Sequence, residues 1–127
     1  MAEEAKEYVL RCAQCSQVLT KPLRRYTGPL ECGDQKPYVP PRTVGTTDGE
    51  SFGFPEGRFA VGLADVNGLE PVADLRRRNG CCGLDGCDGP NTMCACGAEL
   101  ATEKSDCWMP HAVVFEPDMV VLTPASS

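Results

Sequence analysis

Two stretches decide the fold: Tyr8-Val-Leu-Arg-Cys12-Ala-Gln-Cys15 near the start of the chain and Cys94-Ala-Cys96-Gly97 near its end. Each holds two closely spaced cysteines, and most of the chain lies between the two pairs. Pairs of this kind are typical of one tetrahedral metal ion that joins two turns. We therefore predict a Zn²⁺ site formed by Cys12, Cys15, Cys94 and Cys96. Gly97 frees the backbone after its cysteine, whereas Ser16, which follows Cys15, suits that place less well.

The chain has nine cysteines, so five remain outside this first site. A second zinc ion could be held by four of them, which lie in or beside glycine-rich turns: Cys32, Cys81, Cys82 and Cys87. Successive side chains of an extended chain point apart. We therefore expect only one of the neighbours Cys81 and Cys82 to be a ligand, and the other to belong to the core.

The fifth remaining cysteine, Cys107, lies four positions before the only histidine, His111. We interpret Cys107 as a small buried apolar residue and His111 as a hydrogen-bonded structural histidine. Either residue could instead join one of the two metal sites. A nucleophile and base at this spacing would meet only on a helix, which Pro110 opposes.

Composition and charge restrict the function classes. With 127 residues, 42% of them hydrophobic but only 6% aromatic, the chain suits one domain, 1–127, with a core of small apolar side chains. Such a domain gains much from a metal cross-link. The net charge of -6 argues against a nucleic-acid partner, because phosphate binding draws its affinity from a basic face.

Segment polarity bears on the cellular compartment. The N-terminal residues are polar and acidic and lack the apolar stretch of a secretory signal. No apolar run approaches the ~18 residues that span a bilayer. We therefore predict a cytoplasmic protein with no membrane partner. A reducing compartment keeps thiols free, which favours metal binding over disulfides.

The apolar pattern and the turn residues predict a mostly β fold with antiparallel sheets, long loops and little helix. One short helix is expected over Val72–Arg78, between Pro71 and Asn79-Gly80. The proline-rich segment 37–57 is expected to be a long surface loop carried over one sheet face. Strands are expected at 8–11, 17–20, 58–66, 112–115 and 119–122, the last two forming a terminal pair.

The layout of strand, C-x-x-C, sheet-rich middle, second cysteine pair and closing strand resembles the β-tent fold of Yippee proteins and the cereblon CULT domain. The resemblance implies two knuckles that hold one structural zinc at the apex of two antiparallel sheets. The chain departs from this family at Cys94-Ala-Cys96, where C-x-x-C is usual, and in its insertion 80–91. The cereblon type holds a cyclic imide in a cage of several tryptophans. This chain has only Trp108, so that ligand is not carried over.

We therefore predict a non-catalytic, zinc-stabilised binding module that engages a protein partner through loops 37–57 and 80–91. Phe52 and Phe54, which lie among glycines, could anchor the partner, or could simply plug the sheet. The residues that two catalytic zinc sites require are missing from this sequence. A deaminase needs a His-x-Glu or Cys-x-Glu element before its cysteine pair, and a hydrolytic site usually needs two or three histidines.

A thiol-disulfide redox protein using Cys12 and Cys15 is the alternative. In such proteins a strand precedes the C-x-x-C pair, and the helix that follows lowers the pKa of the attacking thiol. Residues 8–11 could supply the strand and Ser16 to Leu19 the first helical turn. Pro22 would then limit this helix to less than two turns.

Overall fold

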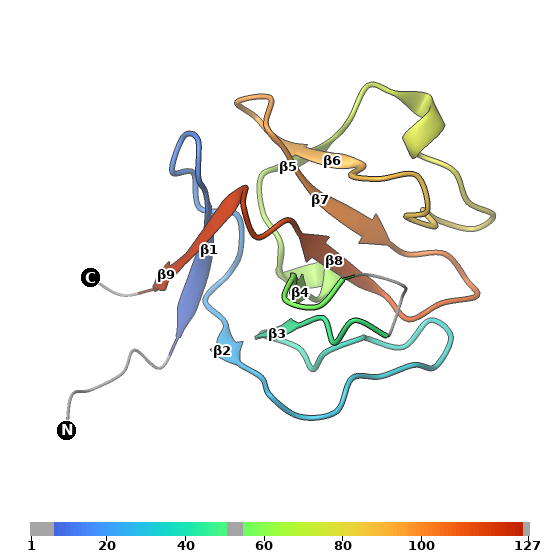
Figure 1. The fold of residues 1–127 in the computed structure, drawn as a ribbon, viewed down its shortest axis with the longest axis horizontal. Helices are drawn as coiled ribbons and strands as arrows, with labels where there is room; N and C mark the ends of the chain where they lie inside the picture. Colours follow the sequence, from blue (N-terminus) through green and yellow to red (C-terminus); the bar gives the residue numbers. More distant parts are fainter. Residues whose placement is uncertain (1–6, 51–54, 126–127) are drawn as a thin grey trace.

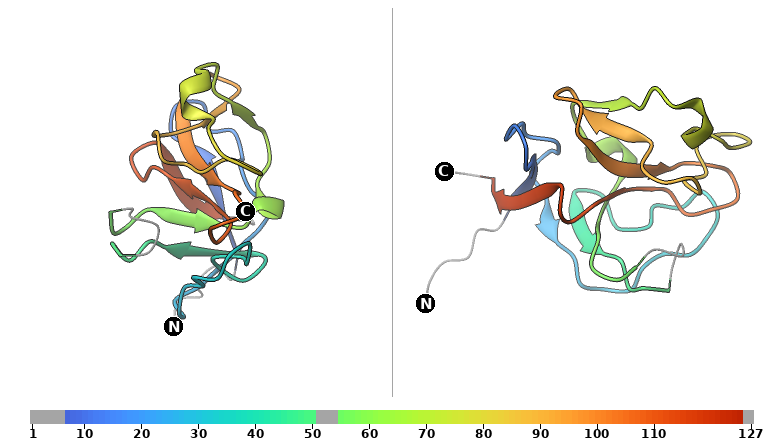
Figure 2. Two further views of the ribbon diagram at one scale, coloured as in Figure 1. Left: turned by 90° about the vertical axis from the view of Figure 1, so that its right-hand side faces the viewer. Right: turned by 45° about the horizontal axis from the view of Figure 1, so that its top comes forward.

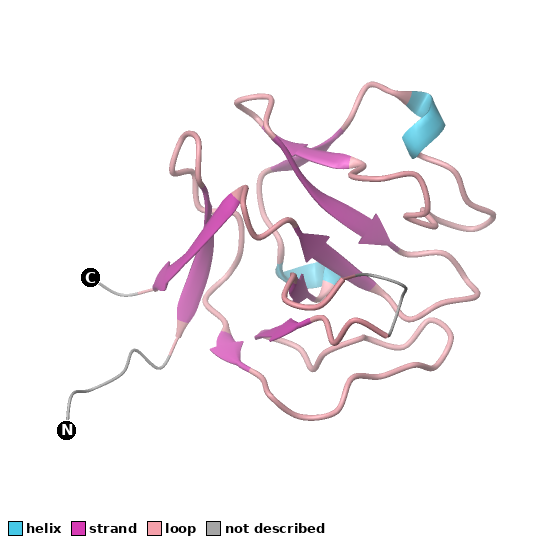
Figure 3. Ribbon diagram, viewed as in Figure 1, coloured by secondary structure: helices cyan, strands magenta, loops and turns pink. Residues whose placement is uncertain are grey.

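Strands and loops make up almost all of the structure, a computed structural model that describes residues 7–50 and 55–125 (Figures 1 and 3). The prediction of a mostly β fold with little helix is confirmed. The helices of the described residues are two single 3-10 turns, η2 (Leu63–Asp65) and η3 (Leu75–Arg77), neither long enough to cross a bilayer. The strands are β1 (Tyr8–Cys12), β2 (Arg24–Arg25), β3 (Thr43–Thr46), β4 (Phe59–Val61), β5 (Leu69–Pro71), β6 (Thr92–Cys94), β7 (Glu99–Lys104), β8 (Ala112–Phe115) and β9 (Val120–Pro124).

The strands form two sheets. β1 and β9, the two ends of the described chain, pair antiparallel as a sheet of two strands, from Tyr8 opposite Pro124 to Cys12 opposite Val120. The other seven strands form one sheet in the order β2-β3-β4-β8-β7-β6-β5, in which only β2 and β3 are parallel. Figure 2 shows the β1–β9 pair set to one side of this larger sheet.

The main hydrophobic core joins the two sheets. Strand β8 lies between β4 and β7 and is buried on both faces. Val113 and Phe115 belong to the main core, whereas Ala112 and Val114 belong to a second, smaller cluster on the other face. The main core also takes residues from β1, β9 and the knuckle turns, among them Leu10, Val120, Cys12, Cys94 and Leu100.

Three strand predictions differ from the structure. Residues 17–20 make only isolated bridges, because the Thr20 hydroxyl accepts the Leu10 N–H and Pro22, which has no N–H, follows shortly. Strand β4 covers only part of the predicted 58–66, since the chain turns into η2 after Gly62. Strands at 112–115 and near 119–122 are present, but they do not pair with each other: β8 pairs with β4 and β7, and β9 with β1.

The predicted helix over Val72–Arg78 is reduced to the single turn η3. Asp74 caps this turn by accepting the backbone N–H of Arg76 at 3.0 Å, which leaves room for one turn before Asn79-Gly80. Arg77 then pairs with Asp74 and Glu99. The extended residues before Asp74 therefore shorten the helix to about half of the expected length.

Segment 37–57 is only partly the predicted surface loop. Tyr38 and Val39 are buried against β4 and β8, as expected for a segment that crosses a sheet face. Residues 43–46, however, form β3, which lies between β2 and β4 in the sheet. Phe52 and Phe54 lie outside the described residues, so their role as anchors stays a prediction.

The position of Phe115 in the main core predicts a large loss of stability on truncation. Phe115→Ala removes a fully buried ring and should lower the free energy of unfolding by about 3–5 kcal/mol, measured by urea denaturation. Val121→Ala, at a residue of β9 that is 48% exposed, should change it by less than about 0.5 kcal/mol. Equal effects of the two substitutions would contradict the placement of this core.

Candidate metal centre

Four cysteines from two distant turns come together beside the core. Cys12 is the last residue of β1 and Cys94 the last of β6; Cys15 and Cys96 lie in the turns that follow. The four Sγ atoms all lie within 4.8 Å of one another. Figure 1 shows the two turns, after β1 and between β6 and β7, at the same end of the molecule. The structure thus brings together the four residues that the sequence analysis paired.

The spacing of the sulfur atoms fits a tetrahedral ion. Four sulfurs at about 2.3 Å from a central Zn²⁺ stand roughly 3.8 Å from one another. The Sγ atoms of Cys12 and Cys96 are 3.7 Å apart, and those of Cys15 and Cys94 are 3.5 Å apart. Each of these two pairs takes one sulfur from each turn, so an ion between them would join the two sheets. The cluster could therefore hold a metal ion.

The two turns are built alike despite their different lengths. In each, the residue after the second cysteine donates its N–H to the carbonyl of the first: Ser16 to Cys12 and Gly97 to Cys94, both at 2.8 Å. Both donors also have positive φ, 68° for Ser16 and 96° for Gly97. The shorter C-x-C turn thus presents its sulfurs like the C-x-x-C turn, and Ser16 takes the conformation for which glycine is better suited.

The environments of the four thiols differ. Cys12 and Cys94 are buried, whereas Cys15 and Cys96 are exposed. Burial raises the pKa of the Cys94 thiol to about 12. The Ala98 backbone hydrogen bond lowers the pKa of Cys96 to about 7. Because a metal ligand must be the thiolate, a metal ion that binds here has to displace the proton of Cys94.

A second group of thiols lies elsewhere. The Sγ atoms of Cys81, Cys82 and Cys107 all lie within 4.8 Å of one another. Cys32 and Cys87, which we expected in this site, are exposed and belong to no such group within the described residues. The expected core position of Cys107 is also wrong, because its side chain is partly exposed.

The prediction that Cys81 and Cys82 diverge is wrong as well. Their sulfurs lie 3.9 Å apart, because the chain bends here and is not extended. The carboxylate of Asp106 holds this bend by accepting both backbone N–H groups at 2.9 Å. These two hydrogen bonds contribute most to holding the pKa of Asp106 well below its usual range. Sequence reasoning missed Asp106, whose role depends on a contact between distant segments.

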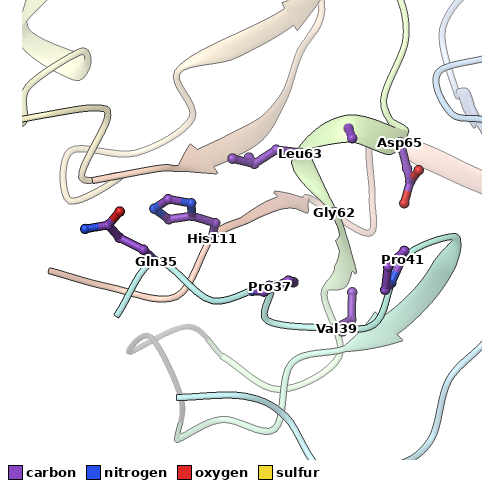
Figure 4. Close-up of a pocket in the computed structure, with 9 residues that line it drawn as sticks. Gln35, Pro37, Val39, Pro41, Gly62, Leu63, Asp65 and His111 are labelled. Atoms are coloured by element: carbon purple, nitrogen blue, oxygen red, sulfur yellow. The ribbon is translucent and has the colours of Figure 1, made fainter. Parts of the chain in front are cut away.

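His111 is hydrogen-bonded, as expected, and belongs to neither thiol group. Its Nε2 atom lies 2.9 Å from the carbonyl oxygen of Asp106. The same ring lines a pocket of about 230 Å³, with Gln35 beside it and Asp65 at the far end (Figure 4). Asp65 accepts the Arg42 N–H at 2.7 Å, so two of the polar groups of this pocket already have partners. The pocket is also smaller than ligand pockets usually are.

The helix that a thiol redox protein would place after Cys15 is not formed. Residues 13–15 are a turn, Ser16 has positive φ, and residues 17–20 are irregular. No helix dipole is therefore available at this place to activate a thiol of the C-x-x-C turn.

Comparisons with family models, with curated proteins and with solved structures found no match for this chain. The β-tent resemblance therefore rests on the cysteine layout and stays a prediction.

The positive φ of Ser16 predicts opposite effects of two substitutions. Ser16→Gly should raise the free energy of unfolding by up to about 1 kcal/mol, since glycine adopts this conformation without strain. Ser16→Val should lower it by about 1–3 kcal/mol. Ala13→Val, in the same turn without positive φ, is the control and should change stability by less than about 0.5 kcal/mol in thermal or urea unfolding. A Ser16→Val protein as stable as this control would contradict the turn geometry.

Proposed function

We propose that this protein is a non-catalytic binding module stabilised by one Zn²⁺ at Cys12, Cys15, Cys94 and Cys96. The observation that carries the proposal is the approach of four thiols from two turns, with sulfur spacings close to those of a tetrahedral zinc site. Four protein ligands complete the coordination of zinc and leave no open position for a substrate. Closed sites of this kind are structural, whereas catalytic zinc sites keep one position open.

The place of the site also favours a structural role. β1 and β9 form a sheet of only two strands, and such a sheet is marginally stable alone. Cys12 ends β1, while Cys94 ends β6 of the larger sheet, so the ion would fasten the small sheet to the large one. The β-tent resemblance also implies two antiparallel sheets held at two knuckles. The two sheets here, antiparallel except at the β2–β3 pair, are close to that arrangement, which supports assigning this chain to that type of fold.

A protein partner is the proposed ligand of the module, and insertion 80–91 is the first candidate surface. This segment packs against β7 and the loop that follows: Leu84 and Ser105 exchange hydrogen bonds, and the Lys104 ammonium donates to the Asp85 carbonyl. Trp108 lies beside it with 55% of its surface exposed. Its indole N–H donates to Asp106, which holds the ring in place. A rigid, half-exposed tryptophan is a common anchor at protein interfaces.

Loop 37–57 is the second candidate surface, and only part of it is available. Tyr38, Val39 and Val44 are buried in the fold and cannot meet a partner. Residues 48–50 and 55–57 are exposed at the far end of the segment, on either side of Phe52 and Phe54. We therefore assign partner contact within this loop to its exposed end.

Zinc analysis tests the proposed metal site. The purified, reduced chain should carry zinc that is released together with loss of the fold when a strong chelator is added. Cys94→Ser should remove this ion and lower the free energy of unfolding by more than about 4 kcal/mol, because the loss of a structural metal is among the changes that destabilise a protein most. Elemental analysis and thermal unfolding measure both quantities.

Cys32→Ser is the matched control, since Cys32 is exposed and lies outside both thiol groups. It should keep the same zinc content and the same melting temperature as the unchanged chain. A Cys94→Ser protein that melts normally without zinc would refute a structural role for the ion. A reversible disulfide between Cys12 and Cys15 in a metal-free, folded chain would favour the redox alternative.

Trp108 tests the proposed partner surface. Cross-linking and mass spectrometry would identify bound proteins, and a purified partner would then be titrated against the chain. Trp108→Ala should weaken this binding by about 2 kcal/mol or more, the loss typical of an anchor residue. Val121→Ala, exposed on β9, should bind normally. A partner that binds the Trp108→Ala protein as tightly as the unchanged chain does not use this surface.

A further inference from the structure

We propose that Cys81, Cys82 and Cys107 form a second metal site, in which three thiolates hold one soft metal ion and leave a coordination position open to solvent. This site does not depend on the structural zinc proposed above. It uses other cysteines and other loops, and it joins the insertion 80–91 to the loop between β7 and β8.

The sulfur positions carry the proposal. All three Sγ atoms lie within 4.8 Å of one another, and those of Cys81 and Cys82 are 3.9 Å apart. Three sulfurs bound to one ion at about 2.3 Å would be spaced at roughly 3.8 to 4.0 Å, depending on whether the geometry is tetrahedral or planar. The group is therefore close to the arrangement of a bound ion, although Cys107 is distant in sequence from the other two.

One carboxylate positions all three cysteines. Asp106, whose surface is only 1% exposed, accepts the backbone N–H groups of Cys81, Cys82 and Cys107 at 2.8 to 2.9 Å, and the indole N–H of Trp108 at 2.8 Å. These four donors occupy both carboxylate oxygens, so Asp106 orients the ligand residues and is not itself a ligand. Such supporting contacts are typical of metal sites.

Two glycines allow the bend of the 80–83 segment and its approach to the 105–108 loop. A Cβ atom on Gly83 would lie 2.3 Å from the carbonyl oxygen of Ser105, and one on Gly80 would lie 1.6 Å from the carbonyl oxygen of Gly83. Both are clashes with backbone that no side-chain movement relieves. Glycine at position 80 therefore lets the segment Gly80-Cys-Cys-Gly83 bend on itself, and glycine at position 83 lets it approach the 105–108 loop.

The donor set indicates the class of metal. Thiolates select soft ions such as Cu(I) and Zn²⁺. No fourth Cys, His, Asp or Glu joins this group within residues 7–50 and 55–125, and the His111 ring already contacts the Asp106 carbonyl. Because Cys81 and Cys82 are exposed, the open position faces solvent. An ion here can exchange, unlike one enclosed by four ligands.

The two metal sites lie at opposite ends of one strand. The first site precedes β7 and the second follows it, so they are separated by about 20 Å, the length of a strand of six residues. Figure 1 shows the turn before β7 and the loop after it at opposite ends of the sheet. Each site should therefore bind its ion independently, and metal bound at the two can be counted separately.

Metal titration of the full, reduced chain tests the proposal, with Zn²⁺ in one experiment and Cu(I) in another. Once the first site holds zinc, we expect each chain to bind one further ion of Zn²⁺, of Cu(I) or of both. Weak chelators should remove this second ion before they remove the first zinc. Cys107→Ala and Cys81→Ala should each weaken this second binding more than about 100-fold and leave the first zinc unchanged. Asp106→Asn should weaken it about 10–100-fold through the lost positioning bonds.

Cys87→Ala and Cys32→Ala are the matched controls, since both remove an exposed cysteine outside the group. They should keep the second ion. The proposal is overturned if the reduced chain binds only one ion in the Zn²⁺ titration and also only one in the Cu(I) titration. It is also overturned if Cys87→Ala loses the second ion while Cys107→Ala and Cys81→Ala keep it. Circular dichroism of each variant verifies its fold, and Cys81→Ala replaces Cys107→Ala if the latter does not fold.

Discussion

The approach of the Cys12 and Cys94 turns is the constraint on which the rest of the structure depends. Each of these residues ends a strand of a different sheet, and both are buried in the core that the sheets share. The strands of both sheets are short, so few hydrogen bonds hold each one. An ion bound by four sulfurs at this place would supply a cross-link that the sparse aromatic core cannot replace.

Strand β7 connects this constraint to the surface of the molecule. Its first residue follows the turn that holds Cys96, and its last residue leads into the loop that holds Asp106 and Cys107. Asn91 holds the last part of this strand. Its side-chain N–H donates to the Glu103 carbonyl, and its side-chain oxygen accepts the Glu103 N–H. The strand thus has a thiol group at each end, a group of four cysteines before it and a group of three after it, of which Cys81 and Cys82 are exposed.

Sequence reasoning identified all four residues of the first thiol group. For the second it named Cys81 and Cys82 but grouped them with Cys32 and Cys87, and it left open which site Cys107 could join. The first group follows from spacing, because closely spaced pairs place their sulfurs on the same side of one turn. The second group combines a neighbouring pair with Cys107, and spacing contains no signal for that meeting. Only the bend held by Asp106 brings Cys81 and Cys82 to one side. Glycines at 80 and 83 were the available signal, and they were interpreted only as turn residues.

The sequence by itself determined the fold class, the first group of cysteines, and strands such as 8–11 and 112–115, because these depend on local pattern and local turn chemistry. Only the tertiary structure decided that β9 pairs with β1 and not with β8, that residues 43–46 enter the sheet, and that Cys107 meets Cys81 and Cys82. Pairing between distant segments depends on which faces are buried together. That choice is made by the whole core and cannot be assigned to any single stretch of chain.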